Sequence, residues 1–550
     1  MKRCKLLILF AAVLMLFFSG CDGFFYDGNT IITLKGNTAE YKGINVNIVS
    51  SAVYGTIVEI TGEGKFTIQG TLNQGFVAVS KKDIDVTIVL NGVNIFCRNY
   101  AALTCLKSSN VILELAKGTV NYLSDGGMDM VDGKYPLGYD YTDQPNATIL
   151  TRRNLTIRGT GKLVVNSQGN NGIASRTNLR IENGDISVSA VNNGIKGNDS
   201  VTITGGKFKI ESDKDGIISE NKDNGMGGIN ISGGEFDITV ISDAIQASTS
   251  LTIANAGFNI KTGGGSGSAV IDRSVKGLKA GSDIIINSGN FFIDSSEDGI
   301  NSNGTIIING GTFEISCGND GIKAGKRLII YDGNINIKKC YKGVASRDID
   351  LYGGFLKIIC NQDGINIAGG TDSEASLNRE TSGTLMITGG EYYIESIGDG
   401  IDVNGSIVIT GGTVVIFGST SEPEVPIDYL GTFNMTGGTI IALGLQGDEA
   451  QQPSSGQYSF LARFSNNIPA DSLINVSSDS GEEIITVKTR KPTLGIILCS
   501  PLLGQGTYII SSGGSHSGTL NNLNLMTGGT YSGGNVIKTI TLVNMITVFN

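Results

Sequence analysis

The chain has 550 residues, of which 79 are glycine and none is tryptophan, and its formal net charge is −10. The glycine share is roughly twice the usual one, but no Gly-X-Y period and only 8 prolines accompany it, which excludes collagen. With 40% hydrophobic and 17% charged residues, the chain can bury a core. Its negative charge disfavours nucleic acid as a partner. The composition leaves a turn-rich β-architecture or an array of repeats.

The N-terminus has the pattern of an export signal. Basic residues precede an apolar run from Leu6 to Phe18, which is too short to cross a bilayer but matches a secretory signal. Ser19-Gly20-Cys21 then resembles the lipobox of bacterial lipoproteins, in which the cysteine carries the lipid. We predict a lipoprotein signal peptide over residues 1–20 with lipid on Cys21; the alternative is a cleaved signal followed by an ordinary cysteine. The chain would then be exported and anchored to a bacterial membrane, in the periplasm or on the cell surface.

The other cysteines do not form a disulfide framework. They are sparse, and no CxxC pair occurs among them. Cys317 and Cys360 each end an alternating stretch on its apolar side, so we expect buried thiols in the core.

Residues 60–446 form an internal repeat, less regular before residue 165. Short stretches that alternate apolar and polar residues, such as Thr312 to Cys317, are typical of strands. A Gly-Gly turn and an Asp/Asn-Gly-Ile corner recur between them. The corner residues are Gly172, Gly194, Gly216, Ala244, Gly277, Gly299, Gly321, Gly343, Gly364 and Gly400. Their spacing returns to 22 residues, and the longer intervals contain insertions at 219–228, 263–276 and 369–383, which we expect to loop out.

Two or three short strands per 22 residues, all returning in the same direction, describe one coil of a parallel β-helix. Coils about 4.8 Å apart would make residues 170–440 a rod about 50 Å long. The apolar residue after each corner would stack in one interior file. That file is Ile173, Ile195, Ile217, Ile245, Leu278, Ile300, Ile322, Val344, Ile365 and Ile401. We therefore predict an all-β chain with an N-terminal tether and leading strands at 21–59, a β-helix at 60–446 and a small C-terminal β cap or sandwich at 457–550.

The residue before each corner glycine, or before Ala244, forms a second file, here named the corner file. Its members are Asn171, Asn193, Asp215, Asp243, Lys276, Asp298, Asp320, Lys342, Asp363 and Asp399. Turn chemistry alone can explain a single Asp-Gly pair. Stacked carboxylates about 5 Å apart, however, repel by roughly 3 kcal/mol at an effective dielectric constant of 20, so turn chemistry alone would favour asparagine.

Paired carboxylates from adjacent coils are ligands that a hard cation such as calcium requires. The single histidine, His516, lies outside the repeat, which argues against zinc or iron. We expect calcium ligands at Asp215, Asp243, Asp298, Asp320, Asp363, Asp399 and Asp402.

Several motifs together resemble bacterial extracellular carbohydrate-binding-domain proteins. They are Asn91-Gly92-Val93-Asn94-Ile95, Thr156-Ile157-Arg158-Gly159-Thr160-Gly161, the Gly-Gly-Thr-Phe repeats, Asp243-Ala244-Ile245-Gln246-Ala247 and Thr527-Gly528-Gly529-Thr530-Tyr531-Ser532-Gly533-Gly534. The resemblance implies a calcium-binding, right-handed β-helix shaped like a pectate lyase, which binds plant cell-wall polysaccharide, acidic pectic chains included. Where the family pattern has Tyr-Glu-Gly, an apolar residue and Glu, this chain has Tyr341-Lys342-Gly343-Val344-Ala345, which removes two carboxylates.

Three functions are consistent with these features. The first is a calcium-dependent, non-catalytic polysaccharide-binding protein, with no nucleic acid or protein partner implied and with the membrane contacted only through the lipid. Its expected glycan contacts are Tyr341, Lys342, Lys323, Tyr392 and Tyr393. The second is a calcium-dependent polysaccharide lyase, in which Lys342 or Lys276 would abstract a proton from a uronate. The third is a structural or adhesin-like rod that calcium stiffens.

Overall fold

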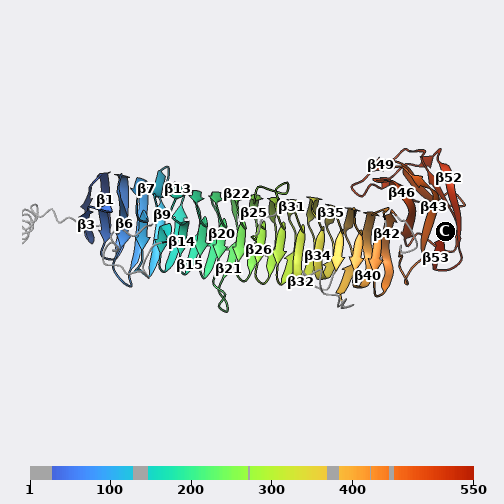
Figure 1. Cartoon of the computed structure of the whole chain (residues 1–550), viewed down its shortest axis with the longest axis horizontal. Helices are drawn as coiled ribbons and strands as arrows, with labels where there is room; N and C mark the ends of the chain where they lie inside the picture. Colours follow the sequence, from blue (N-terminus) through green and yellow to red (C-terminus); the bar gives the residue numbers. More distant parts are fainter. Residues whose placement is uncertain (1–27, 128–145, 270–272, 368–382, 422, 445–450) are drawn as a thin grey trace, which may run out of the picture.

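The computed structural model describes residues 28–127, 146–269, 273–367, 383–421, 423–444 and 451–550. Every regular element in these ranges is a β-strand, which confirms the all-β prediction, and none of them contains a helix that could cross a membrane. Figure 1 shows an elongated rod, with the first strands at one end and the C-terminal strands at the other. The predicted signal peptide at 1–20 and the predicted lipid attachment site, Cys21, lie outside the described residues.

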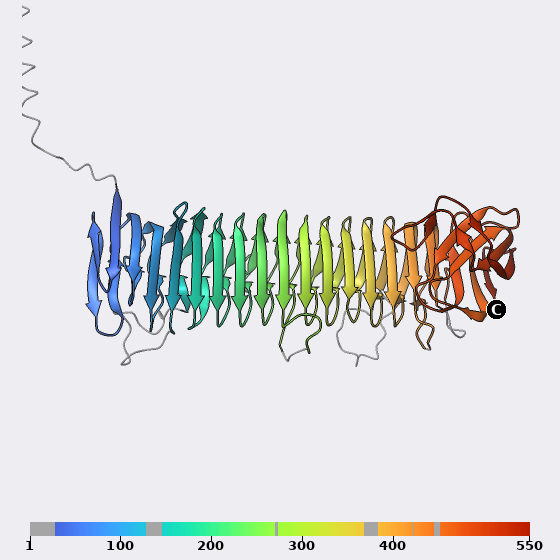
Figure 2. The same cartoon turned by 90° about the horizontal axis from the view of Figure 1, so that it is seen from above.

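The rod is one 45-stranded, mostly parallel sheet. Between the two ends of the rod, each strand pairs with the strand in the same position one repeat later, so three faces run along the rod (Figure 2). The first face follows the Asp-Gly corners and contains β4(Gly55–Ile60), β6(Gly75–Val79), β8(Leu103–Cys105), β11(Ala147–Thr151), β14(Asn171–Ser175), β17(Ile195–Gly197), β20(Ile217–Ser219), β23(Ile245–Ala247), β26(Leu278–Ala280), β29(Ile300–Ser302), β36(Ile365–Ile367), β39(Ile401–Val403) and β41(Ile427–Tyr429).

The second face precedes the Gly-Gly turns, and the third face follows them. The second face contains β9(Asn110–Leu115), β12(Asn154–Gly159), β15(Asn178–Ile181), β18(Ser200–Ile203), β21(Gly228–Ile231), β24(Leu251–Ile253), β27(Ile284–Ile286), β30(Thr305–Ile308) and β37(Gly383–Ile387). The third face contains β10(Val120–Asp125), β13(Lys162–Ser167), β16(Asp185–Ala190), β19(Lys207–Ser212), β22(Gly234–Val240), β25(Ala256–Thr262), β28(Gly289–Ser295), β31(Thr312–Cys317), β33(Asn334–Lys339), β35(Phe355–Cys360) and β38(Glu391–Ser396). Longer strands continue around a corner and belong to two faces: β5(Gly64–Leu72), β7(Asp85–Cys97), β32(Ile322–Ile330), β34(Val344–Leu351), β40(Gly405–Phe417) and β42(Phe433–Leu443).

The core fills the inside of the rod. All ten residues of the predicted interior file, from Ile173 to Ile401, have no exposed surface, and the strand registers place them next to one another. The third face adds a stack of phenylalanine rings with centroids 4.6–5.1 Å apart. The stacked rings are Phe208, Phe236, Phe258, Phe291 and Phe313. Alternation places every second residue of a strand inside, so this pattern accounts for the period-two sequence.

Antiparallel strands close both ends of the rod. At the N-terminal end β1(Asn29–Gly36) pairs with β2(Ala39–Lys42), and β3(Val46–Ser51) pairs with β4. At the other end β42 pairs with β46(Thr493–Cys499), which continues the sheet to β43(Ser459–Ile468) and β53(Ile546–Phe549). A separate four-stranded sheet and two short hairpins follow from β44(Leu473–Ser478), β45(Glu483–Lys488), β47(Gly506–Ser512), β52(Asn535–Leu542), β48(Ser515–His516), β51(Tyr531–Ser532), β49(Thr519–Leu520) and β50(Met526–Thr527).

The C-terminal strands also cover the outer side of the third face. Tyr392 belongs to the main core, whereas its neighbour Tyr393 belongs to a second core with Phe417, Leu443 and C-terminal residues such as Phe460. Tyr392 and Tyr393 are 0% and 2% exposed. The expectation that they offer ring surfaces to a glycan is therefore wrong, because one lies inside the rod and the other under the C-terminal strands.

The cysteines and insertions follow the sequence pattern where they are described. All cysteines from Cys97 to Cys499 are buried and free. Residues 220–227 and the described parts of 263–276 contain no strand, as expected for loops. The third insertion, 369–383, lies outside the described residues except for Gly383, which begins β37.

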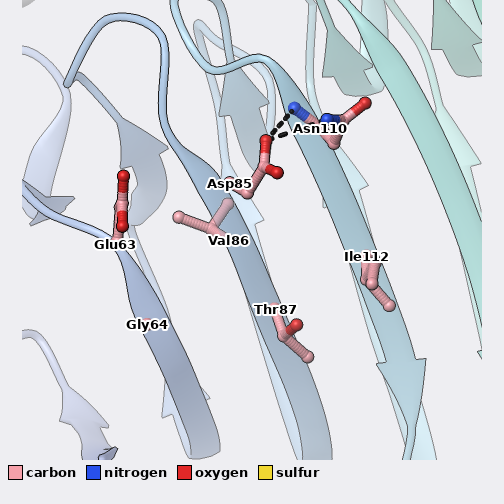
Figure 3. A pocket seen from close by; sticks show the side chains of 7 residues that line it. All are labelled: Glu63, Gly64, Asp85, Val86, Thr87, Asn110 and Ile112. Atoms are coloured by element: carbon pink, nitrogen blue, oxygen red, sulfur yellow. Dashed lines mark hydrogen bonds between the residues drawn. The ribbon is translucent and has the colours of Figure 1, made fainter.

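Shallow hollows mark the outer surface. One of about 360 Å³ lies on the second face near the N-terminal end (Figure 3). One of its two carboxylates, Asp85, already accepts hydrogen bonds from the backbone N–H and side-chain amide of Asn110, at 3.1 and 2.9 Å. A larger one of about 570 Å³ lies on the third face between β16 and β28.

A candidate metal centre at the end of the corner file

The corner file is held together by a hydrogen-bond ladder. In Asp215, Asp298 and Asp363 the side-chain Oδ1 accepts the backbone N–H of the corner-file residue one repeat later, at 3.0, 3.1 and 3.2 Å. The amide oxygens of Asn171 and Asn193 make the same bond, at 3.2 and 3.1 Å. Because these N–H groups lie at tight corners, the file satisfies donors that burial would otherwise leave unpaired. Turn chemistry thus uses one oxygen of each side chain, and the second oxygen of each aspartate remains for another partner.

Lysines occupy that second oxygen in the middle of the rod. Lys279 Nζ lies 2.9 Å from Asp243 Oδ2, and Asp243 has no exposed surface. Lys276 contacts Glu297 and lies 3.7 Å from Asp298 Oδ2. These carboxylates therefore already have built-in counter-ions.

The next repeats continue the same pattern with weaker pairing. Lys323 Nζ lies 3.4 Å from Asp320 Oδ2, and Lys342 Nζ lies 3.4 Å from Asp363 Oδ2. Burial and the charge of Asp298 still raise the pKa of Asp320 to about 6. In the Asp215–Asp243 pair, burial and the charge of Asp243 raise the pKa of Asp215 to about 7.

The same contacts bear on the two candidate catalytic bases. Burial lowers the pKa of Lys276, but the charges of Asp298, Glu297 and Asp243 outweigh it, and the pKa is raised. A general base needs the opposite shift, so this placement argues against Lys276 as the base of a lyase. Lys342 likewise lies beside a carboxylate, Asp363.

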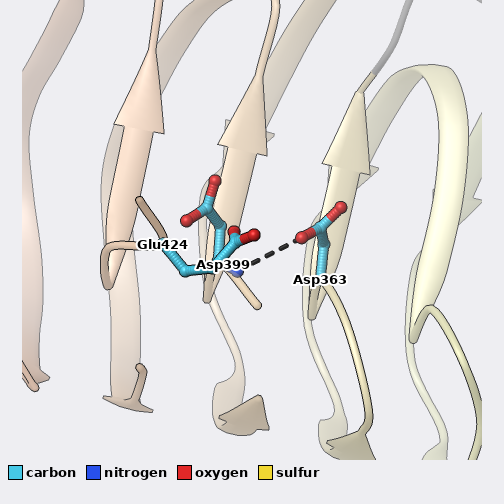
Figure 4. A group of neighbouring side chains, drawn as sticks. All are labelled: Asp363, Asp399 and Glu424. Carbon is cyan, nitrogen blue, oxygen red and sulfur yellow. Dashed lines mark hydrogen bonds between the residues drawn. The ribbon is translucent and has the colours of Figure 1, made fainter. Parts of the chain in front are cut away.

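A group of five carboxylates, here named the carboxylate cluster, ends the corner file. It consists of Asp363, Asp399, Asp402, Glu424 and Asp428. Ligand oxygens of Asp363, Asp399 and Glu424 lie within 4.8 Å of one another, and so do those of Asp399, Asp402 and Asp428. Figure 4 shows the first three side chains gathered on adjacent repeats, with the Asp399 N–H donating to Asp363. Within the described residues, groups of three or more acidic side chains close enough to share a metal ion occur at this place alone.

The charge of the cluster is poorly compensated. Asp399 is 9% exposed, and burial together with the charges of Glu424, Asp363 and Asp402 raises its pKa to about 8. Burial and the charges of Asp363 and Asp428 raise the pKa of Asp402 to about 7. In the part of the chain that the structure describes, Lys342 is the one basic side chain in a salt bridge with the cluster. A bound cation would supply the missing positive charge.

The donor set fits a hard cation. All five side chains offer carboxylate oxygens, which calcium prefers over nitrogen or sulfur ligands. Next to Asp363 in the chain, Gln362 Oε1 is buried and accepts no hydrogen bond from the described residues.

The structure brings together part of the predicted calcium ligand set. Asp363, Asp399 and Asp402 meet in the cluster, whereas Asp215, Asp243, Asp298 and Asp320 form separate pairs farther along the rod. Glu424 and Asp428 were missed, because the last corner reads Val425-Pro426-Ile427 and lacks the Asp-Gly signature. The spacing was a signal for Asp428 alone, which is in register with Asp402, two residues after the Pro426 that replaces the corner glycine. Among the predicted glycan contacts, Tyr341 is 42% exposed.

Comparison with known proteins adds a family. The family described as carbohydrate-binding domain-containing protein matches residues 54–321 and 316–478. A protein of that description from Acetivibrio thermocellus is 39% identical over 134 residues, which cover 24% of this chain and 45% of the relative. The match thus spans less than half of the relative's length. A solved structure of a polysaccharide lyase-like protein from C. thermocellum, a gadolinium derivative, is 34% identical and covers 43% of this chain and 92% of that one, with a TM-score of 0.39.

Proposed function

Because the chain belongs to the family of carbohydrate-binding domain-containing proteins, we propose that it binds an acidic polysaccharide through calcium held at the carboxylate cluster. The observation that carries the proposal is the convergence of five carboxylates, with a single salt bridge, from Lys342, to the cluster among the described residues. Calcium would neutralise the cluster and leave coordination positions for sugar carboxylates or hydroxyls, since it takes six to eight oxygen ligands. Pectic chains, which carry a carboxylate on each galacturonate, fit such a site.

Exposed groups beside the corner file support the same location for the glycan. Tyr341 is an exposed ring next to Lys342, and Lys323 and Lys342 present partly exposed ammonium groups. These cations can attract an anionic chain toward the cluster, while the tyrosine offers apolar surface to a sugar ring.

Calorimetry tests the proposal. We expect calcium to bind the purified protein and polygalacturonate to bind only when calcium is present. Asp399→Asn should abolish both, because it removes the carboxylate common to both ligand groups. Asp298→Asn is the matched control, since Asp298 occupies the same file and makes the same backbone bond but faces Lys276. Calcium-independent binding, or equal loss in both variants, would refute the role of the cluster.

The same preparation distinguishes binding from lysis. The pairing of Lys276 and Lys342 with carboxylates favours binding without catalysis. We expect no unsaturated product from polygalacturonate and calcium. A product signal that disappears in Lys342→Met would establish the lyase instead.

The fold and location complete the proposal. A right-handed parallel β-helix is supported by the parallel pairing of each strand with its counterpart one repeat later and by the three faces of the rod. We place the protein at the bacterial envelope, with a lipid on Cys21 and the calcium site displayed far along the rod. Palmitate labelling in a bacterial host, lost in Cys21→Ser, is the expected result; labelling that persists in this variant would contradict it.

A further inference from the structure

The hollow on the third face has the composition of a second carbohydrate site. Its outward side chains come from adjacent strands in register: Lys209, Asp237, Asn259 and Phe292 follow one another on β19, β22, β25 and β28. Beside this row, Gly257 stands between Glu235 and Asn290 and contributes no side chain. Because Gly257 has no side chain, the carboxylate of Glu235 lies over it and adds a polar group to the wall of the hollow.

Phe292 is the unusual member of this row. Its ring is 52% exposed, although outward positions of neighbouring strands carry polar or charged residues. The core does not need it, because the preceding residue, Phe291, occupies the interior ring stack between Phe258 and Phe313. An exposed aromatic ring in a largely apolar hollow with polar side chains around it is the arrangement of a ligand site, where the ring gives contact area and the polar groups give orientation.

The charged and polar side chains around the hollow suit a neutral sugar better than an anionic one. Lys207 and Lys209 oppose Asp185, Glu235 and Asp237, so the charges nearly cancel. The side-chain amide of Asn259 donates to Asp237 at 2.9 Å, so the row holds both a donor and an acceptor. Donors and acceptors mixed in this way can bind hydroxyl groups without a metal ion, whereas the carboxylate cluster needs a cation to hold an anionic ligand.

The hollow is long enough for a short oligosaccharide. Five adjacent strands, β16 to β28, line it, and at a strand spacing of about 4.8 Å they extend over roughly 19 Å of the rod. Its volume of about 570 Å³ lies within the range of small-ligand sites. It is separated from the carboxylate cluster along the rod and lies on a face rather than at the corner.

We propose that this hollow is a second, calcium-independent subsite for a neutral pyranose oligosaccharide, with Phe292 stacking on the apolar face of one sugar ring. The inference rests on the proposed carbohydrate-binding function but not on the calcium site. The chain would then contact a cell-wall glycan at two places: anionic segments at the cluster and neutral segments at the third face.

Calorimetry in EDTA with cellohexaose, xylohexaose and mannohexaose tests the inference on the full chain. We expect at least one hexasaccharide to bind, and Phe292→Ala to weaken that binding at least tenfold. Tyr331→Ala is the matched control, since Tyr331 is similarly exposed at 48% but lies outside the hollow. The affinity of this variant for the hexasaccharide should stay within twofold of the wild type. Equal melting temperatures would show that both variants are folded.

The outcomes separate this inference from the calcium proposal. If none of the three hexasaccharides binds in EDTA, or if Phe292→Ala binds as the wild type does, the third-face subsite is refuted. Polygalacturonate binding with calcium should persist in Phe292→Ala and disappear in Asp399→Asn. Failure of wild-type polygalacturonate binding would refute the calcium proposal and leave the EDTA result unaffected.

Discussion

Replacing Asp399 with asparagine should stabilise the calcium-free protein above neutral pH. The pKa of Asp399 is raised from 3.8 to about 8, first by burial and then by neighbouring carboxylates. The folded chain therefore holds a proton between about pH 4 and pH 8 that the unfolded chain has released, so stability falls as the pH rises through this window. At about 1.4 kcal/mol per unit this amounts to roughly 5 kcal/mol at pH 8, and screening by water reduces it to about 3 kcal/mol.

The asparagine variant keeps the Oδ1 acceptor for the Val425 N–H and removes the charge. A gain of about 3 kcal/mol corresponds to about 3 °C in melting temperature for a chain of this size. Calorimetric melting in EDTA at pH 5, 6.5 and 8 should show wild type and variant converging at low pH and separating at high pH. Calcium at one hundred times its dissociation constant should restore about 2.7 kcal/mol to the wild type and nothing to the variant.

Asp298→Asn is the control for the electrostatic reasoning. Its carboxylate makes the same backbone bond but lies 3.7 Å from Lys276 Nζ, so losing its charge should not stabilise the protein. Two results would refute the argument: an Asp399→Asn variant that melts with the wild type at pH 8 in EDTA, or a gain of the same size in Asp298→Asn.

Three further predictions concern the ladder, the ring stack and the corner. Asp363→Ala leaves the buried Asp399 N–H without its acceptor and should lower the unfolding free energy by about 1–3 kcal/mol in urea titration, whereas Asp363→Asn should lower it less. Phe258→Ala empties a position between two stacked rings and should cost about 3–5 kcal/mol in the same assay; a cost below that of the exposed Phe292→Ala would contradict the packing. Gly343→Ala places a Cβ 2.3 Å from the Gly364 carbonyl oxygen and should lower the melting temperature by about 1–3 °C; an unchanged melting temperature would show that the corner can relax.

The repeat made the interior of the rod predictable from sequence. A 22-residue spacing with alternating apolar residues leaves one register that buries all of them, and the file from Ile173 to Ile401 follows from it. The burial of Tyr393 could not be predicted in this way. Its position on the outer side of β38 is exposed in an uncovered sheet, and only the return of residues near Phe460 covers it.

The carboxylate cluster, the candidate metal site, was predictable only as far as its motif extended. Asp363 and Asp399 carry the Asp-Gly signature, whereas Glu424 belongs to a loop whose path no periodicity describes. Which carboxylates have a lysine partner also depends on side-chain reach across repeats: Lys279, three residues after Lys276, contacts Asp243 one repeat earlier. Spacing alone cannot give such contacts.

The ladder explains why the corner file changes composition along the rod. At its start Asn193 donates its amide to Asn171 at 3.0 Å, so asparagine supplies both the acceptor for the backbone and a donor for its neighbour. Aspartate supplies the acceptor but not the donor, and lysines form ion pairs with four of these carboxylates, those of Asp243, Asp298, Asp320 and Asp363. Beyond that point no salt bridge reaches Asp399 among the described residues, while the number of neighbouring carboxylates increases. Asparagine would have met the structural needs there, so the added charge supports the proposal that a cation binds at this end of the file.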